Sequence, residues 1–193
     1  MSFGGPIRHT TMTDEARVRE DITGSLRAED GQGIVRIEAR LGAAVHDVWS
    51  AIADADRLAG WYGEAAGDLR PGGEFRLHVP VSGWTGTGRV VECDAPHRLV
   101  VTTRESDESS QAGVGAKPFD KSLDATLRGD AGQTVLTLEV VGVPVDAIAF
   151  FGAGWQLHVE ALADYVAGRE TRADETRFDA LVPGYQALAA ELS

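Results

Sequence analysis

A histidine placed three residues after a tryptophan is the feature of this sequence that most clearly suggests chemical activity. In GAGWQLHVEALADYVAG, residues 152–168, Trp155 and His158 fall on the same side of a predicted helix. An imidazole has an ordinary pKa of about 6.5, which suits proton transfer near neutral pH. His158 is therefore the candidate catalytic residue, as a general acid or base. The simpler alternative is a core histidine with one satisfied hydrogen bond.

Proton transfer by His158 requires a partner group. Charged residues on neighbouring predicted elements could supply one, and their spacing favours none over the others. These candidates are Glu64, Asp68, Arg76 and Arg104.

Aromatic residues from several predicted elements form a second candidate group. Each one alone is most simply a core residue. As a set they offer more aromatic surface than a small core needs, and small-molecule pockets are lined by apolar and aromatic groups with a few polar ones. The residues predicted to line a ligand cavity are Trp49, Trp61, Phe75, Trp84, Phe151, Trp155, His158 and Leu162.

The sequence contains no residue pattern typical of a metal site or of a catalytic nucleophile. The five histidines are scattered without ligand spacing, and the single cysteine, Cys93, makes no cluster. No Gly-x-Ser-x-Gly motif is present. The glycines of SGWTGTG lie between two predicted strands, so they predict strand bending rather than a phosphate-binding loop before a helix. We expect no metal and no cofactor.

The composition limits which partners and which cellular compartment we expect. The chain has 193 residues and a formal net charge of −12 with no basic patch. It is therefore expected to bind neither nucleic acid nor an anionic membrane. One cysteine excludes an internal disulfide. No apolar run reaches the length of a membrane span, and the N-terminus lacks the apolar centre of a secretory signal, so we expect a cytoplasmic protein.

The hydrophobic period changes along the chain and predicts the order of the elements. Alternating runs around Asp30-Gly31 predict a β-hairpin over 22–41, and helical spacing over 43–63 predicts two short helices. Residues 65–142 alternate with a period of two and contain turn signals, which predicts a meander of antiparallel strands. From Pro144 the apolar residues return to helical spacing, which predicts one long amphipathic helix across the sheet.

Residues 21–168 are predicted to form the main domain. The polar residues 1–20 are expected to be a mobile tail, and 106–118 a long loop. Residues 169–193 are predicted to be a C-terminal helical extension, which Pro183 should kink or divide. The apolar residues of this extension either pack on their own domain or form a homodimer surface. They are Phe178, Leu181, Tyr185 and Leu188.

This order of elements resembles the START/Bet v 1-like (SRPBCC) superfamily, and more closely its bacterial branch named after the activator of the Hsp90 ATPase. The matching stretches are VWSAIADADRLAGWYG, GDLRPGGEFRLHV, GTGRVVECDAPHRLVV, TVLTLEVVGVP and GWQLHVEALADYV. The resemblance implies an α+β helix-grip fold, in which a curved antiparallel β-sheet wraps around a long C-terminal α-helix. It also implies two short helices after the first strands and an internal apolar cavity.

Three functional hypotheses follow, because superfamily members bind lipids, sterols, hormones or polyketides and some are enzymes. The first is binding of a hydrophobic or aromatic small molecule in the cavity between the sheet and the long helix. The second is an enzyme on the same scaffold, such as a polyketide cyclase or aromatase, a dehydratase or a hydrolase, with acid/base chemistry at His158. A second titratable group within hydrogen-bond reach of His158 would favour it. The third is an interaction protein resembling a chaperone cofactor.

Overall fold

A single antiparallel sheet organises the fold. The structure is a computed structural model that describes residues 21–106, 119–171 and 174–192. The expected tail, 1–20, and residues 107–118 of the expected loop lie outside these ranges. Eight strands follow the order β1-β2-β8-β7-β6-β5-β4-β3. Their bounds are β1 Ile22–Glu29, β2 Gln32–Leu41, β3 Glu64–Gly67, β4 Glu74–Val79, β5 Trp84–Asp94, β6 Arg98–Glu105, β7 Asp120–Asp130 and β8 Gln133–Val143.

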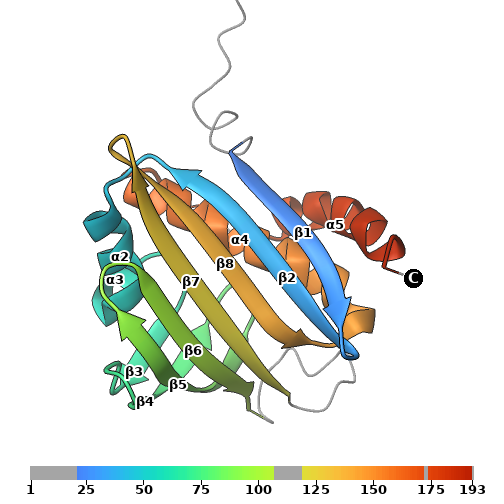
Figure 1. Cartoon of the computed structure of the whole chain (residues 1–193), viewed down its shortest axis with the longest axis horizontal. Helices are drawn as coiled ribbons and strands as arrows, with labels where there is room; N and C mark the ends of the chain where they lie inside the picture. The colour runs from blue at the N-terminus through green and yellow to red at the C-terminus, as the bar shows by residue number, and fades with distance from the viewer. Residues whose placement is uncertain (1–20, 107–118, 172–173, 193) are drawn as a thin grey trace, which may run out of the picture.

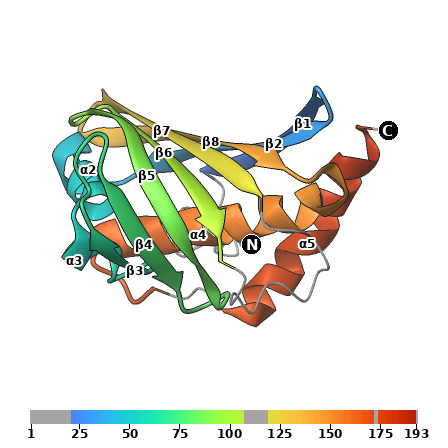
Figure 2. The same ribbon diagram turned by 90° about the horizontal axis from the view of Figure 1, so that it is seen from below.

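Helices cover one face of this sheet. The short helices α2 (Val45–Ala53) and α3 (Ala55–Leu58) connect β2 to β3, and the long helix α4 (Ile148–Val166) follows β8. Figure 2 shows α4 running beneath the sheet, with the strands curving over it. The helix α5 (Glu175–Ala190) lies beside α4 near β1 (Figure 1). This is the expected α+β helix-grip fold. Within the described ranges, no helix is long and apolar enough to cross a membrane.

Two tight turns set the register of the edge hairpin β1–β2 and of the central hairpin β7–β8. Asp30 and Gly31, between β1 and β2, have φ angles of 51° and 77°. Ala131 and Gly132, between β7 and β8, repeat the arrangement at 48° and 84°. Two consecutive residues with positive φ match the right-handed twist of a two-residue hairpin. The hairpin predicted over 22–41 is confirmed, and its register pairs Glu29 with Gln32 next to the turn.

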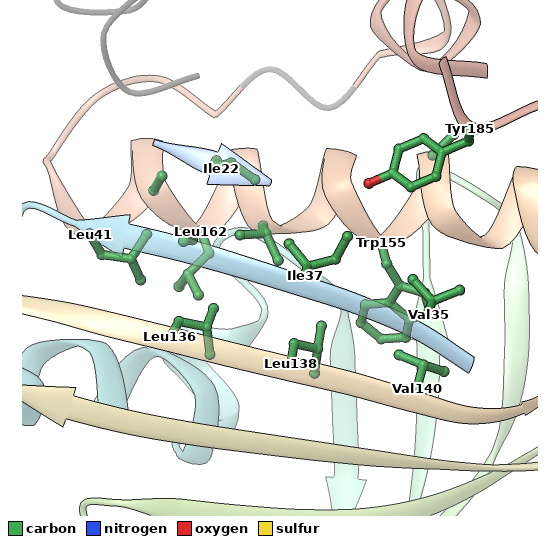
Figure 3. Close-up of a cluster of buried hydrophobic side chains, with 14 of the residues drawn as sticks. Ile22, Val35, Ile37, Leu41, Leu136, Leu138, Val140, Trp155, Leu162 and Tyr185 are labelled. Carbon is green, nitrogen blue, oxygen red and sulfur yellow. The ribbon is translucent and has the colours of Figure 1, made fainter. Parts of the chain in front are cut away.

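The main core lies between α4 and the sheet half made of β1, β2 and β8. Alternate residues of β2, such as Val35 and Ile37, are fully buried and meet apolar side chains of β8. Leu162 fills the same core from α4 (Figure 3). Ile148, at the start of this helix, is buried in the same core. Burying such side chains contributes about 1.5–3 kcal/mol each before entropy is counted. This packing fixes α4 against one half of the sheet.

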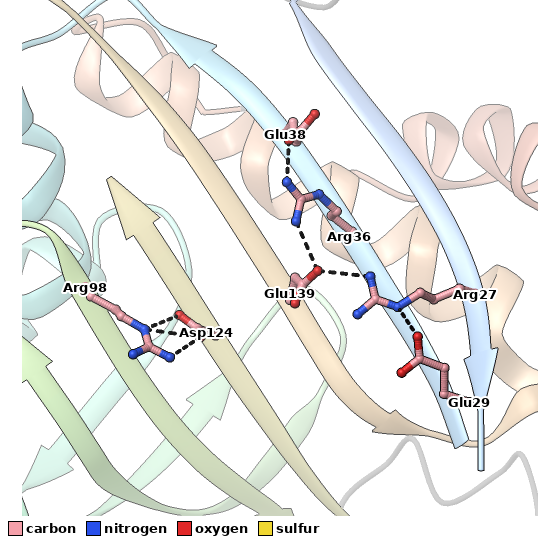
Figure 4. Close-up of polar contacts among 7 residues, drawn as sticks. All are labelled: Arg27, Glu29, Arg36, Glu38, Arg98, Asp124 and Glu139. Atoms are coloured by element: carbon pink, nitrogen blue, oxygen red, sulfur yellow. Dashed lines mark hydrogen bonds and ion pairs between the residues drawn. The ribbon is translucent and has the colours of Figure 1, made fainter. Parts of the chain in front are cut away.

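The opposite face of the sheet is charged and wet. Arg36 places Nη1 3.1 Å from Oε1 of Glu139 across the β2–β8 pair, and Nη2 2.6 Å from Glu38 (Figure 4). Arg98 and Asp124 form a similar pair between β6 and β7, at 2.7 Å. Such exposed ion pairs contribute about 0–1 kcal/mol each. They mark the outer face as solvated, whereas the buried apolar side chains gather on the inner face.

The C-terminal helix α5 packs on its own domain through Tyr185. The Tyr185 ring is buried between β1 and α4, where it faces Gly24 and Gly152. A Cβ atom at Gly152 would lie 2.3 Å from Cδ1 of Tyr185, so the ring needs a glycine there. Pro183 lies inside one continuous helix, Glu175–Ala190, so of the two expectations, a kink or a division, the division is wrong.

A chain of hydrogen bonds reinforces the contact between α4 and α5. The Tyr185 hydroxyl donates to Oε1 of Gln156 at 2.8 Å, and the Gln156 amide donates to Glu160 at 3.1 Å. Arg177 of α5 donates from Nε to Glu160 at 2.7 Å. Glu160 is 6% exposed, and removing its partner would leave a buried charge unpaired.

Gly152→Ala is therefore expected to destabilise the protein, although alanine favours helices over glycine. The clash with Tyr185 should cost a net of about 1–3 kcal/mol of unfolding free energy, measured by urea denaturation. The matched control is Gly154→Ala, two residues along the same helix, where the nearest atom to a new Cβ is Cε2 of Phe178 at 3.9 Å. That variant should gain up to about 1 kcal/mol. Equal effects in the two variants would contradict the close packing of α5 on α4.

Candidate functional site

A cavity of about 700 Å³ lies between the inner face of β4–β7 and the first half of α4. The strands contribute Leu77, Val79, Trp84, Thr103, Glu105 and Lys121, and α4 contributes Phe150, Phe151, Gly154, Trp155, Leu157 and His158. The start of α5 closes one side with Asp174, Glu175 and Phe178. The volume is within the range of small-molecule sites, roughly 300–1,000 Å³.

Glycines in β5 make room for two aromatic rings on the inner face of the sheet, Trp84 at the cavity and Phe75 beside it. A Cβ at Gly86 would lie 2.5 Å from Cη2 of Trp84, and one at Gly88 would lie 2.3 Å from Cζ of Phe75. The two rings therefore lie directly over the strand, which only glycine permits. The sequence predicted these glycines as points of bending. The irregular register of β5 falls further along, between Val90 and Glu92.

The aromatic rings at the helix side form two contact groups, one around Tyr62 and one made of Phe119 and Phe151. Tyr62 stacks on Trp155 with a centroid separation of 5.8 Å, and it meets the His158 ring edge-on at 4.7 Å. Phe119 contacts Phe151 edge-on at 5.6 Å. These rings give the cavity rigid walls, since aromatic pairs of this geometry are favourable beyond their buried area.

A lysine ammonium lies among these rings. Nζ of Lys121 is 4.7 Å from the centroid of Trp84, 5.3 Å from that of Phe151 and 5.8 Å from that of Phe119. Burial lowers the pKa of Lys121 to about 8, and the negative charge of Glu105 opposes this shift. Within the described ranges, no hydrogen bond or ion pair holds the ammonium. The rings instead provide cation–π contacts.

Four buried side-chain atoms without a hydrogen-bond partner among the described residues all belong to the cavity wall. They are Nε1 of Trp84, Oγ1 of Thr103, Oε1 of Glu105 and Nδ1 of His158. Their chemistry is mixed, because the indole only donates, a carboxylate only accepts, and the hydroxyl and imidazole can do either. The wall is therefore apolar in area but carries several unused polar positions.

His158 is held in its neutral form. Burial, and to a smaller extent the positive charge of Lys121, lowers the pKa of His158 to about 4. Nδ1 has no hydrogen-bond partner in the described part of the chain, so the second titratable group expected for acid/base chemistry is not in place at that atom. Tyr62, which contacts the imidazole ring, has a raised pKa because it is buried.

The partners suggested for His158 by the sequence lie elsewhere. None of the four lines the cavity. Asp68 is bound by Arg70 at 2.9 Å, and Arg104 by Asp120 at 3.1 Å. Arg76 and Glu64 are exposed, because alternation along β4 and the short β3 turns them to the outer face.

The structure divides the eight predicted cavity residues into two groups. Trp84, Phe151, Trp155 and His158 line the cavity together; that they bind a ligand stays a prediction. The other four are not at its wall. Leu162 is buried in the main core, and Phe75 covers Gly88 in a second apolar cluster.

The remaining two of these four, Trp49 and Trp61, pack at the edge of the main core. The Trp61 indole donates to the carbonyl of Ala51 at 2.9 Å, which joins the end of α3 to α2 and turns the ring away from the cavity.

Sequence reasoning missed the polar residues of the cavity. Thr103 and Lys121 are direct partners in the β6–β7 pairing, and Glu105 follows on the same face of β6. One signal could have found Lys121, because period-two alternation puts it on the same face as Phe119 and Leu123. A lysine within an apolar row is unusual in a buried strand face.

These features define the class of protein: an α+β helix-grip domain with a cavity between the sheet and the C-terminal helix. Residues 43–167 match the family described as Activator of Hsp90 ATPase homolog 1-like protein, and the chain belongs to this family. A comparison with curated proteins gives no match.

Several solved structures share the fold. The crystal structure of CalU16 from Micromonospora echinospora has a TM-score of 0.64 and 25% identity, over 88% of this chain and 97% of that one. DynU16, a protein in the dynemicin biosynthetic locus, has a TM-score of 0.61 and 28% identity over 75% of this chain and 50% of that one. EF2215 from Enterococcus faecalis, of unknown function, has a TM-score of 0.68 and 17% identity over 89% of this chain and 92% of that one. This likeness shows the fold alone.

The neutral state of His158 predicts a pH-dependent stability. Between pH 6.5 and 4 the unfolded chain protonates this histidine but the folded chain does not. The contribution of neutral His158 to the free energy of unfolding is fully present above pH 6.5. It is lost as the pH falls towards 4, and the total loss is about 3 kcal/mol. His158→Gln should remove this part of the acid-induced loss, measured as unfolding free energy in urea at pH 7 and pH 4.5.

The exposed His46 supplies the matched control for this measurement. His46→Gln should keep the wild-type dependence on pH. If wild type and His158→Gln lost the same free energy between the two pH values, the buried neutral imidazole would be disproved.

Proposed function

We propose that this protein binds a hydrophobic or aromatic small molecule that also carries polar groups, in the cavity between β4–β7 and α4. The observation that carries the proposal is the composition of the wall: an apolar, aromatic cavity of about 700 Å³ that also holds four buried polar atoms without partners among the described residues. Apolar walls supply affinity, and a few polar groups fix orientation.

Among the described residues, the other buried polar side chains have partners, so the four unpartnered atoms at the cavity are exceptional. Thr134 donates from Oγ1 to the carbonyl of Ala43 at 2.8 Å, and Glu160 accepts from Arg177. An unsatisfied buried polar atom costs about 1–3 kcal/mol. Its retention at one wall favours a ligand whose donors and acceptors satisfy these atoms when it binds.

The relatives support a ligand of the secondary-metabolite type. DynU16 is a protein in the dynemicin biosynthetic locus. Among the ligand classes of the superfamily, a polyketide-like metabolite combines fused apolar rings with carbonyl and hydroxyl groups. That chemistry suits a wall with aromatic rings, two donors at Trp84 and Lys121, and an acceptor at Glu105.

The enzyme alternative finds weaker support at His158. With a pKa of about 4, the imidazole is neutral at physiological pH and is a poor general acid. Its unpartnered Nδ1 also lacks the orienting group that a catalytic base normally has. Acid/base chemistry on this scaffold would have to use Lys121 or Glu105 as well.

The interaction-protein alternative rests on the family description. The helix α5 offers little free apolar surface to a second subunit, because Tyr185 is buried and Phe178, Leu181 and Leu188 are half-buried against the core. This favours the reading in which α5 packs on its own domain. The homodimer stays a prediction.

Gly154→Leu provides a test of cavity binding that does not depend on destabilising the protein. Gly154 lines the cavity in the middle of α4, and its Cβ position has only Cε2 of Phe178 within 4 Å, at 3.9 Å. A leucine would favour the helix and project into the cavity. We expect affinity for the neutral fluorescent probe N-phenyl-1-naphthylamine to fall by about tenfold or more, equivalent to about 1.4 kcal/mol.

The matched control is Gly184→Leu, at an exposed position of α5 with nothing within 4 Å. It should leave probe affinity unchanged, whereas Trp155→Ala and Phe151→Ala should alter it. Probe binding that Gly154→Leu leaves intact, or that no apolar compound displaces, would reject the cavity as a binding site.

A further inference from the structure

Lysine is nearly absent from this chain, and one of its two lysines is in the cavity. Of 18 basic residues all are arginine except Lys117 and Lys121. Arginine serves every ion pair that holds the described surface together, including those of Arg36, Arg98 and Arg177. Lysine differs from arginine in that its amine can lose a proton and become a nucleophile.

The position of Lys121 makes its amine accessible from the cavity. It lies opposite Thr103 in the β6–β7 register, on the face that lines the cavity. Three aromatic rings surround Nζ at 4.7–5.8 Å, and no carboxylate within the described ranges is close enough to form an ion pair. Glu105 is near enough to act through its charge, and Oε1 of this residue is buried without a partner there.

We propose that Lys121 is the reactive amine of this cavity, and that it captures aldehydes or ketones with an apolar or aromatic body as an imine at Nζ. The proposal rests on the proposed function, because the carbonyl compound must first enter the cavity. It adds the chemical class of ligand and the residue that bonds to it.

The reaction balances without an oxidant or a reductant. The free amine attacks the carbonyl carbon, so that a C–N bond forms and the oxygen takes up a proton. The resulting carbinolamine loses its C–O bond and the remaining N–H proton, which together release water and leave C=N. The proton that first leaves the ammonium passes to solvent or to the Glu105 carboxylate.

The electrostatic environment agrees with this role. Burial lowers the pKa of Lys121 from 10.5 to about 8. At pH 7 the fraction of free amine is then about 300-fold larger than for an unperturbed lysine. Burial among aromatic rings disfavours the charged ammonium and so favours the free amine that attacks the carbonyl carbon.

Reductive trapping tests the proposal on the full chain. The protein is incubated at pH 7 with 2-naphthaldehyde and sodium cyanoborohydride, which converts an imine into a stable secondary amine. Intact mass should show one early adduct, and fragmentation of the tryptic peptide 105–128, which holds both lysines, should place it on Lys121. We expect labelling at Lys121 to be at least about tenfold faster than at Lys117.

The N-terminal amine is an internal control, because its ordinary pKa is also about 8. The difference in labelling rate between Lys121 and this amine measures how much the cavity accelerates the reaction. This difference should disappear when the protein is unfolded in urea. Lys121→Met should lose the early adduct, and Lys117→Arg should keep both the adduct and the binding of N-phenyl-1-naphthylamine.

Naphthalene separates the two levels of the proposal, since it matches the aldehyde in shape but has no carbonyl. If it displaces the probe while Lys121 reacts no faster than Lys117 and the N-terminal amine, the imine is refuted and cavity binding stands. If neither naphthalene nor the aldehyde displaces the probe, both proposals fail together.

Discussion

The packing of α4 against β1, β2 and β8 is the contact on which the rest of the structure depends. The curved sheet has one wet face and one apolar face, and a single long helix must cover the apolar one. Fully buried residues such as Ile37, Val140 and Leu162 fasten the helix to one half of the sheet. The helix cannot also fill the space under β4–β7, and the cavity is the consequence.

Two glycines in one turn of α4 show how closely packing and cavity are joined. Gly152 lets Tyr185 of α5 approach the helix, and Gly154 leaves the cavity open on the neighbouring side. The helix α5 then closes one side of the cavity with Phe178 and the residues at its start. The extension after the long helix is thus part of the cavity wall, and it is held there by the buried pair of Glu160 and Arg177.

The cavity has an energetic cost that the main core does not have. Its wall keeps a lysine among aromatic rings, a histidine that burial holds neutral, and polar atoms without partners among the described residues. Each of these features lowers stability in the empty protein. Strain and unsatisfied groups of this kind concentrate at functional sites, where a bound molecule can compensate for them.

The sequence by itself determined the elements and the fold class. The alternation in β2, the Asp30-Gly31 turn and the helical spacing after Pro144 are local patterns, and local patterns fix whether a segment is strand or helix and which of its faces is apolar. Their order then resembled a known superfamily. For the site, four of the eight residues that the sequence grouped lie together at the cavity, namely Trp84, Phe151, Trp155 and His158.

Only the tertiary structure decided what covers each apolar face. Phe75 and Trp84 lie on the inner side of neighbouring strands and belong to the same apolar cluster, yet only Trp84 also lines the cavity, whereas the Phe75 ring covers Gly88. Lys121 became a cavity residue because the register sets it opposite Thr103, on the face of the sheet that α4 covers. The periodicity of a segment shows to which face each side chain points. The neighbours of that side chain come from segments distant in sequence, and the packing of the whole core sets how close these segments lie.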